Sequence, residues 1–179
     1  SNNLVHRYMF IGLDGIGKFL FSQEFAKMIL CEDSKPACNV CSSCIKFGSN
    51  NHPDFMIIDS EDGKSIKIGQ IRSMQEQISE KPIVSEKKVY IINNADLMTV
   101  EAQNCLLKTL EEPPEYAIII LVLSNENRLL NTIKSRCTKI NFRKLSNEEL
   151  LQYAKAHQIN IDSSLLDSCN GSILKLINI

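Results

Sequence analysis

The chain has 179 residues, of which 44% are hydrophobic, and its 20 basic and 21 acidic residues give a formal net charge of -1. This length suffices for one substantial core and a small further domain. The balanced charge excludes a protein that recruits nucleic acid through a strong overall positive field. No apolar run approaches the roughly 18 residues of a membrane span, and no secretory signal is visible. We therefore expect a cytoplasmic protein that does not contact membranes.

The first motif is a glycine-rich loop, residues 12–19, which reads Gly-Leu-Asp-Gly-Ile-Gly-Lys-Phe. It lies between an apolar strand expected over residues 8–11 and a helix expected over residues 20–30. In a phosphate-binding loop (P-loop), glycine amides cradle phosphates at a helix N-terminus, a lysine neutralises them, and Ser or Thr holds Mg²⁺. The glycine and lysine positions are filled by Gly12, Gly15, Gly17 and Lys18. We predict a P-loop, the alternative being an ordinary glycine-rich turn.

Two residues of this loop disagree with a working nucleotide site. Phe19 stands where the motif requires a hydroxyl group, and its ring cannot coordinate a metal. Asp14 places a negative charge close to where the phosphates would lie. Lys18 still carries a charge that attracts phosphate. The sequence therefore predicts that nucleotide binding is weakened rather than excluded.

Four of the seven cysteines form a cluster with the spacing C-x6-C-x2-C-x2-C, in a polar segment of about residues 31–50 that we expect to be an inserted loop. In a cytosolic chain, cysteines are more often metal ligands or buried thiols than disulfides. Four thiolates suit tetrahedral Zn²⁺ and leave no open position for catalysis, so we predict a structural zinc. The ligands would be Cys31, Cys38, Cys41 and Cys44. An iron–sulfur cluster and four free thiols are the alternatives.

Strands and helices alternate along the rest of the first 143 residues. His52 lies in a segment that breaks the chain, and we interpret it as a turn residue rather than a metal ligand. Apolar periodicity and continuous apolar runs predict an α/β fold with a mainly parallel sheet. The expected strands are residues 55–59, 89–92, 117–123 and 139–142, and the expected helices are residues 68–78, 102–110 and 127–134.

The end of the strand at residues 89–92 bears on catalysis. In P-loop ATPases the equivalent strand ends in acidic residues that hold the magnesium shell and polarise the attacking water. Asn93 and Asn94 occupy those positions here. An amide brings no negative charge to Mg²⁺ and is no general base at neutral pH. Together with Phe19, these residues predict a chain that does not hydrolyse ATP.

These motifs together resemble bacterial clamp-loader subunits of the AAA+ family, and the resemblance spans almost the whole chain. The chain is more similar to the delta-prime type of DNA polymerase III than to the ATP-hydrolysing gamma/tau type, because Phe19, Asn93 and Asn94 replace functional groups. The motifs that carry the resemblance, in chain order, are Gly12-x4-Gly17-Lys18, the four cysteines, Asn51 to Asp54, Ile92-x2-Ala95-Asp96-x-Met98, residues 102–114 and Ser135-Arg136-Cys137.

The resemblance implies a division of the chain into two domains. Residues 1–143 would form a P-loop NTPase-like AAA+ domain, and residues 144–179 a helical lid. Ser146 and Glu149 form a capping box that opens the first lid helix, which runs to about His157. A second helix is expected over residues 162–169 and a third from Gly171. The family's C-terminal collar domain is absent, so we expect the chain to be an N-terminal fragment of a longer subunit.

The resemblance also implies a function. Arg136 would reach across a subunit boundary, as a catalytic group in trans, to the γ-phosphate of ATP bound by a neighbour, while this chain is itself ATPase-inactive. Ser124 and Asn125 match the sensor 1 region, and Leu174 stands where an active subunit would carry a phosphate-contacting arginine.

The partners implied are the gamma/tau and delta subunits, with a sliding clamp and primed DNA reached through the complex. An ATP-hydrolysing gamma/tau-like subunit is the alternative. A zinc-dependent nucleic-acid-binding module is less consistent with the neutral charge and the aromatic-poor cysteine segment.

Overall fold

The centre of the fold is a five-stranded sheet in which every pairing is parallel. The computed structural model describes residues 4–33, 36–161 and 163–177. The strands lie in the order β2-β3-β4-β1-β5, which confirms the predicted α/β class. Their bounds are β1 Arg7–Ile11, β2 Phe55–Ile58, β3 Lys88–Ile92, β4 Ala117–Leu123 and β5 Thr138–Asn141.

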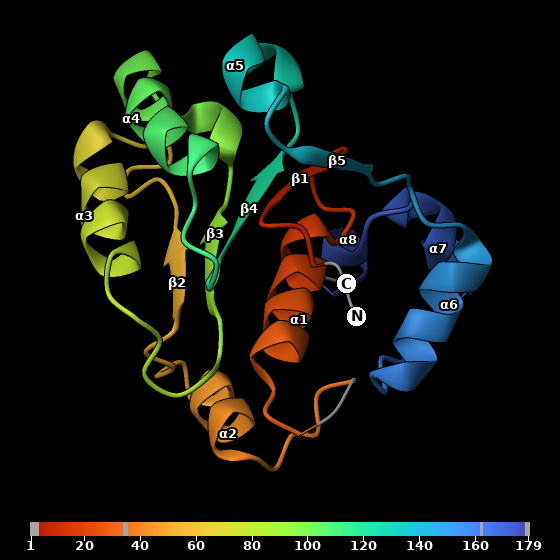
Figure 1. Cartoon of the computed structure of the whole chain (residues 1–179). Helices are drawn as coiled ribbons and strands as arrows, with labels where there is room; N and C mark the ends of the chain where they lie inside the picture. The colour runs from red at the N-terminus through yellow and green to blue at the C-terminus, as the bar shows by residue number, and fades with distance from the viewer. Residues whose placement is uncertain (1–3, 34–35, 162, 178–179) are drawn as a thin grey trace.

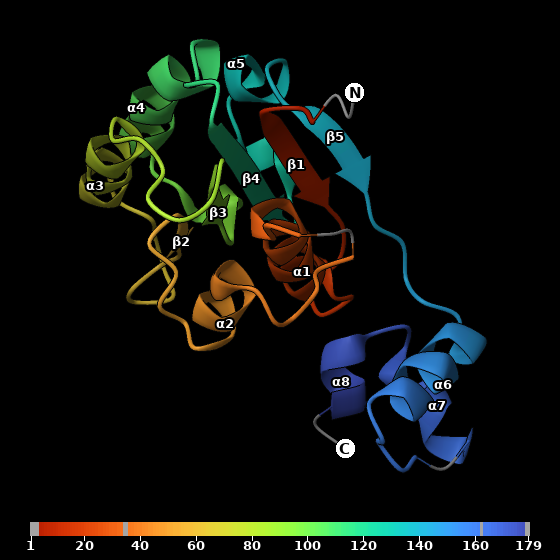
Figure 2. The same ribbon diagram turned by 60° about the horizontal axis from the view of Figure 1, so that its bottom comes forward.

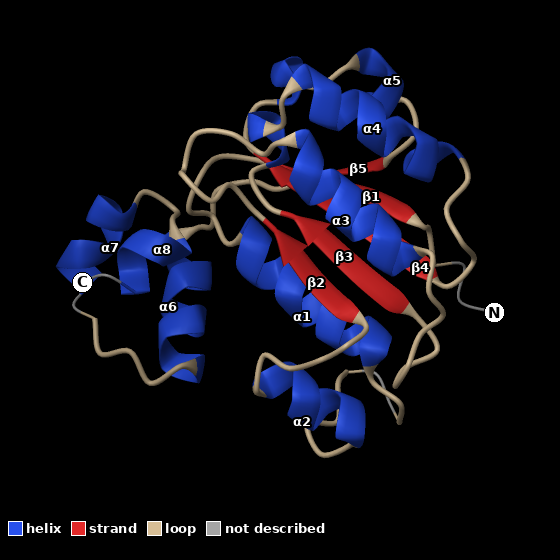
Figure 3. Cartoon of the chain, turned by 90° about the vertical axis from the view of Figure 1, so that its left-hand side faces the viewer, coloured by secondary structure: helices blue, strands red, loops and turns tan. Residues whose placement is uncertain are grey.

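Helices cover both faces of this sheet (Figure 1). α1 (Lys18–Leu30) packs on one face, and α3 (Ile68–Ile78) and α4 (Val100–Glu111) pack on the other (Figure 3). All side chains of β3 and β4 are buried, as expected for central strands that are covered on both sides. Their alternate residues enter two separate apolar clusters, so the continuous apolar runs of the sequence have a direct structural reason.

The cysteine segment differs from the expectation of a loop. It contains a short helix, α2 (Ser42–Gly48), next to the C-terminal end of α1. Cys41 is the N-cap residue, and its side chain accepts a hydrogen bond from the backbone N–H of Cys44. A cysteine is not a usual capping residue, so this helix was not readable from the standard start signals.

The helix expected over residues 127–134 is also wrong in detail. The structure has a 3₁₀ turn, η2 (Glu126–Arg128), and a separate helix, α5 (Asn131–Lys134). The buried side chain of Gln103 causes the break, because its amide accepts from the N–H of Leu130 at 2.8 Å and donates to the carbonyl of Arg128 at 3.1 Å. These backbone groups are therefore satisfied outside a helix.

Three helices after residue 143 pack around an apolar cluster of their own. They are α6 (Asn147–Ala156), α7 (Ser163–Cys169) and α8 (Ile173–Ile177). The predicted capping box of α6 is confirmed, whereas Asp162, where the second helix was expected to begin, lies outside the described residues. Figure 2 shows these helices as a group beside the sheet, near the end of α1 that follows β1. Within the described ranges, every helix is too short or too polar to span a bilayer.

Candidate functional site

The glycine-rich loop connects β1 to α1 at the carboxyl ends of the strands. Gly15 and Gly17 have φ angles of 77° and 97°, in the left-handed region that favours glycine. A Cβ atom at Gly15 would lie 2.6 Å from Ser172 Oγ, and one at Gly17 would lie 2.8 Å from Ile173 Cδ1. The loop therefore needs its glycines both for its own backbone and for the close approach of α8.

Lys18 is turned back onto the loop that carries it. Its side chain is buried, and Nζ donates hydrogen bonds to the carbonyls of Gly12 and Leu13, both at 2.7 Å. Burial lowers the pKa of Lys18 below its ordinary value, although the negative charges of Asp14 and Asp96 oppose that shift. The cation that a P-loop offers to phosphate is thus already bound by the protein.

The polar side chains at the end of β3 are also hydrogen-bonded within the protein. Asn93 Nδ2 and Asn94 Nδ2 donate to the two carboxylate oxygens of Asp59 at 2.8 and 3.0 Å. Asp59 directly follows β2, the neighbour of β3 in the sheet. Sequence reasoning missed this residue as part of the site, although an acidic residue at the end of an adjacent parallel strand is a usable signal. The carboxylate of Asp59 is therefore already hydrogen-bonded to these two amides.

The start of α8 covers the loop. Gly15 accepts two hydrogen bonds through its carbonyl oxygen, one from Ser172 Oγ at 2.9 Å and one from the N–H of Leu174 at 3.1 Å. Leu174 is the residue that stands where the resemblance implies a phosphate-contacting arginine. α8 is therefore joined to the P-loop directly, by hydrogen bonds to Gly15.

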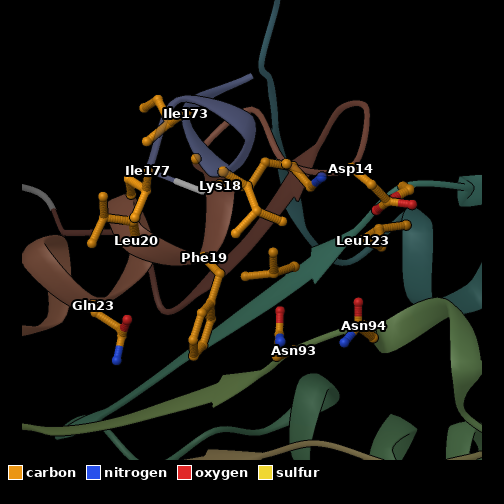
Figure 4. Close-up of a pocket in the computed structure, with 15 residues that line it drawn as sticks. Asp14, Lys18, Phe19, Leu20, Gln23, Asn93, Asn94, Leu123, Ile173 and Ile177 are labelled. Carbon is orange, nitrogen blue, oxygen red and sulfur yellow. The ribbon is translucent and has the colours of Figure 1, made fainter. Parts of the chain in front are cut away.

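A cavity of about 450 Å³ lies between these elements (Figure 4). It brings together the P-loop, the ends of β3 and β4, and α8. Asp14 and Ser124, at its edge, are hydrogen-bonded to each other. The ring of Phe19 lies on the Asn93 side of this cavity in Figure 4, where a magnesium-binding hydroxyl would be needed. Apolar walls dominate, and they are formed by Phe19, Leu20, Val122, Leu123, Ile173, Leu174 and Ile177.

Arg136 lies away from this cavity, at the other end of the parallel strands. It is in the turn between α5 and β5, and β5 begins at Thr138, opposite Tyr8 of β1. Gly12 lies four residues further along the strand direction, or about 13 Å at roughly 3.3 Å per residue. Arg136 and the P-loop thus lie at opposite ends of the adjacent parallel strands β5 and β1, and the arginine cannot serve the loop of its own chain.

The guanidinium group of Arg136 is oriented by two groups of the same chain. Nη2 forms a 2.7 Å ion pair with Glu111 Oε1, and Nη1 donates to the carbonyl of Thr132 at 2.8 Å. The side chain of Arg136 remains 31% exposed and that of Glu111 51% exposed. The arginine is oriented but still accessible from outside, and Glu111 is a residue that the sequence alone did not single out.

The four clustered cysteines are the third site. Their sulfur atoms all lie within 4.8 Å of one another, and Cys38 Sγ and Cys44 Sγ are 4.0 Å apart. Four sulfurs around Zn²⁺ at about 2.3 Å form a tetrahedron with edges of about 3.8 Å. The donor set and its compactness therefore fit a tetrahedral zinc, held between the C-terminal end of α1 and α2. The residues that could hold the metal are Cys31, Cys38, Cys41 and Cys44.

Backbone N–H groups point at three of these sulfurs. Cys38, Cys41 and Cys44 each donate their N–H to the sulfur of the preceding cysteine, at 3.3 to 3.4 Å. Such bonds favour the thiolate form, and the N–H of Cys44 is the main reason that the pKa of Cys41 is lowered. Burial raises the pKa of Cys44 to about 12. A metal that binds here must displace that proton, so binding would weaken in acid.

A buried polar network attaches the cysteine segment to the sheet. His52, directly before the turn at residues 53 and 54, is buried. Its Nδ1 accepts from the N–H of Asp54 at 3.0 Å, so in the neutral ring Nε2 carries the proton and donates to Ser43 Oγ at 2.8 Å. Ser43 in turn donates to the carbonyl of Leu30, at the end of α1.

Asp54 is the other half of this network. Its carboxylate accepts three backbone N–H bonds of 2.7 to 2.8 Å, from residues 83–85 before β3. Burial alone would raise the pKa of Asp54, but these bonds hold it below its ordinary value. The segment Asn51–Asp54 is therefore a brace between α1, α2 and the start of β3.

Comparison with known families decides the affiliation of the chain. The family described as DNA polymerase III, delta subunit, matches residues 1–146. The chain belongs to this DNA polymerase III subunit family. It is 41% identical over 146 residues to DNA polymerase III subunit delta' of Bacillus subtilis, covering 81% of this chain and 44% of that protein. It is 34% identical to the delta' subunit of Pseudomonas aeruginosa, covering 75% of this chain and 42% of the relative.

Relatives of the gamma/tau type are similar as well. The gamma/tau subunit of Mycoplasma pneumoniae is 33% identical, over 97% of this chain and 26% of that protein. The chain thus spans less than half the length of these relatives. The resemblance inferred from the motifs is confirmed at the level of the DNA polymerase III family.

Solved structures with the same fold include a gamma subunit-related protein of Thermotoga maritima. It has a TM-score of 0.59 and 25% identity, covering 84% of this chain and 45% of that chain. The Holliday junction branch migration motor RuvB of the same organism has a TM-score of 0.58 at 13% identity, covering 97% of this chain and 52% of that one. The predicted P-loop NTPase-like AAA+ fold is confirmed.

Proposed function

We propose that this chain is a clamp-loader subunit of DNA polymerase III that does not hydrolyse ATP and supplies Arg136 in trans to a neighbouring ATPase subunit. In this proposal the neighbour's hydrolysis accompanies the loading of a sliding clamp onto primed DNA in the cytoplasm. The partners are gamma/tau and delta subunits. Residues 1–143 are the AAA+ domain, and residues 144–179 are a lid that covers the inactive P-loop.

The observation that carries this proposal is the position of Arg136. The guanidinium is oriented by Glu111, accessible from outside and placed at the opposite end of the parallel strands from its own P-loop, so it is suited to a phosphate on another chain. An arginine supplied in trans stabilises charge that develops on the transferred phosphoryl group.

The proposed lack of ATPase activity rests on the P-loop side. Lys18 is bonded to loop carbonyls, Phe19 brings no hydroxyl, and Asp59 is bound to two amides. A nucleotide would have to break these internal bonds before it gained its own. We also propose a structural Zn²⁺ on the four cysteines, where it would fix the segment between α1 and α2 without taking part in chemistry.

The test is reconstitution of the full-length protein with its partner ATPase subunits, comparing wild type with Arg136→Ala and Arg136→Lys. We expect turnover at the one neighbouring site to fall by about 10³-fold or more in both variants, because Lys keeps the charge but loses the planar fork. Arg72→Ala, at an exposed position of α3, is the control for loss of a positive charge. Unchanged turnover in an intact Arg136→Ala complex would remove the trans role.

A gamma/tau-like subunit that hydrolyses ATP is the second candidate, because gamma/tau relatives match 97% of this chain at 33% identity. It predicts Mg²⁺-dependent ATP binding and turnover by the isolated protein, abolished by Asn93→Ala. Our proposal predicts negligible turnover by the isolated protein, with or without that substitution.

A further inference from the structure

At the end of β3, the cavity beside the P-loop presents hydrogen-bond acceptors. A carboxylate only accepts hydrogen bonds, so the amide atoms that face Asp59 must be the nitrogens of Asn93 and Asn94. This fixes the orientation of both amides. Their oxygens are left to point away from Asp59, and Figure 4 shows both of them on the side of the amide that faces the P-loop. The cavity is thus supplied with two hydrogen-bond acceptors.

The charges around the cavity favour a cation over an anion. Lys18 is the positive charge among the lining residues, and its ammonium group is already bonded to two loop carbonyls. Asp14 lines the cavity, Asp96 lies close enough to act on Lys18, and Asp59 is bonded to the two amides. These three carboxylates outnumber the single lysine. An incoming phosphate would meet net negative charge from these side chains, and the Lys18 ammonium would already be bonded.

The walls of the cavity suit an apolar, planar body. Phe19, Leu20 and Val122 line one part, and Ile173, Leu174 and Ile177 of α8 another. The volume of about 450 Å³ falls within the range of small-molecule sites. An aromatic ring would be covered by these side chains, with its polar end at the asparagine oxygens.

We propose that this cavity binds small aromatic cations, such as aryl amidines, whose N–H groups donate to Asn93 Oδ1 and Asn94 Oδ1 while the ring packs against Phe19 and α8. Asp59 acts as a positioning residue, because it sets the orientation of both amides without lining the cavity. The site would accept a donor-bearing cation where the ancestral P-loop motif accepts an anion. This inference does not depend on the role of Arg136.

The test compares two probes of the same shape, benzamidine and benzoate, titrated into the full chain and followed by ¹H–¹⁵N NMR. Benzamidine carries donors and a positive charge, and benzoate carries acceptors and a negative charge. We expect benzamidine to shift the amide signals of residues 15–20, 93–94 and 173–177 and to bind at least about tenfold more tightly than benzoate, as for a charged hydrogen bond. Equal binding, tighter benzoate binding, or shifts that map elsewhere would overturn the proposal.

Three variants locate the effect. Asn93→Leu keeps the size of the side chain but removes the acceptor, so it should weaken benzamidine about tenfold. Asp59→Asn should reduce the preference for benzamidine over benzoate, because an amide no longer dictates the orientation of its partners. Asn127→Leu, at an exposed position, should change neither. Wild-type affinity in Asn93→Leu would sink the proposal, and Arg136→Ala, which tests the proposed function, should leave benzamidine binding intact.

Discussion

The P-loop and the cysteine segment are both ligand sites encoded by short sequence spacing, yet the structure treats them in opposite ways. In the cysteine segment, four sulfurs converge within 4.8 Å and backbone N–H groups point at three of them. In the P-loop, the lysine that would bind a phosphate is bonded to the protein, since Lys18 donates to loop carbonyls, and the carbonyl of Gly15 accepts from the start of α8. Correct spacing thus favours a ligand only where the binding groups converge on one point and are not already bonded elsewhere in the fold.

This difference has a physical basis in burial. A buried polar group must find a partner, and in the P-loop that partner is available within the fold. The sulfur atoms of the four cysteines instead converge on one point, within 4.8 Å of one another. A metal ion would complete that arrangement, whereas a nucleotide would compete with existing bonds.

Among changes to these two sites, the largest expected effect concerns the metal. Cys44→Ser should lower zinc affinity by more than about 100-fold, beyond the range measured for changes outside the ligand shell, because it removes a buried ligand. Zinc content per chain, measured by mass spectrometry after dialysis against a chelator, checks this. Cys105→Ser is the matched control, since Cys105 lies outside the cluster and donates to Gln75. Full zinc retention in Cys44→Ser would show that the cluster is not a tetrahedral site.

The next largest effect is expected from Asp54, in the segment Asn51–Asp54 that braces the cysteine segment. Asp54→Ala removes a buried carboxylate and leaves three backbone N–H groups without their acceptor, and we expect the free energy of unfolding to fall by about 3 kcal/mol. Denaturant unfolding measures it. Asp62→Ala is the control, because Asp62 also accepts backbone N–H bonds but is exposed. Equal losses in the two variants would contradict the role of burial.

The contact between α8 and the P-loop is expected to contribute less to the free energy of unfolding. Ser172→Ala removes one of the two hydrogen bonds to the carbonyl of Gly15, a loss of about 1 kcal/mol. Hydrogen exchange of the Leu174 amide, which makes the other bond, should become about fivefold faster if α8 opens locally. Ser79→Ala, at the end of α3, serves as the control. An unchanged exchange rate would mean that α8 is held by other contacts.

The smallest effect is a dependence of stability on pH. Burial lowers the pKa of His52, although the charge of Asp54 opposes the shift, so between the folded pKa and about 6.5 the unfolded chain binds more protons. The contribution of His52 is fully present above pH 6.5 or so and is lost as the pH falls toward the folded pKa. The difference between the unfolding free energies of wild type and His52→Asn, measured from pH 5 to 8, should shrink in acid. Parallel curves would contradict this.

Much of the fold was predictable from particular patterns. The buried strands β3 and β4 and the helix α3 follow from continuous apolar runs and from apolar residues at helical spacing, and α6 follows from its capping box. The helix α2 was not predictable because a cysteine caps it. The break before α5 was missed because it depends on the distant side chain of Gln103.

The sequence by itself determined the family, the parallel α/β class, the four cysteines at metal-binding spacing and the missing hydroxyl at Phe19. Each of these depends on residue type and short spacing. Only the tertiary structure decided how the polar groups are paired. It brought Asp59 to the asparagines, Ser172 to Gly15 and Glu111 to Arg136, in each case across at least 20 residues of chain. Spacing along a chain carries no information about such pairings, which depend on how strands and helices are packed.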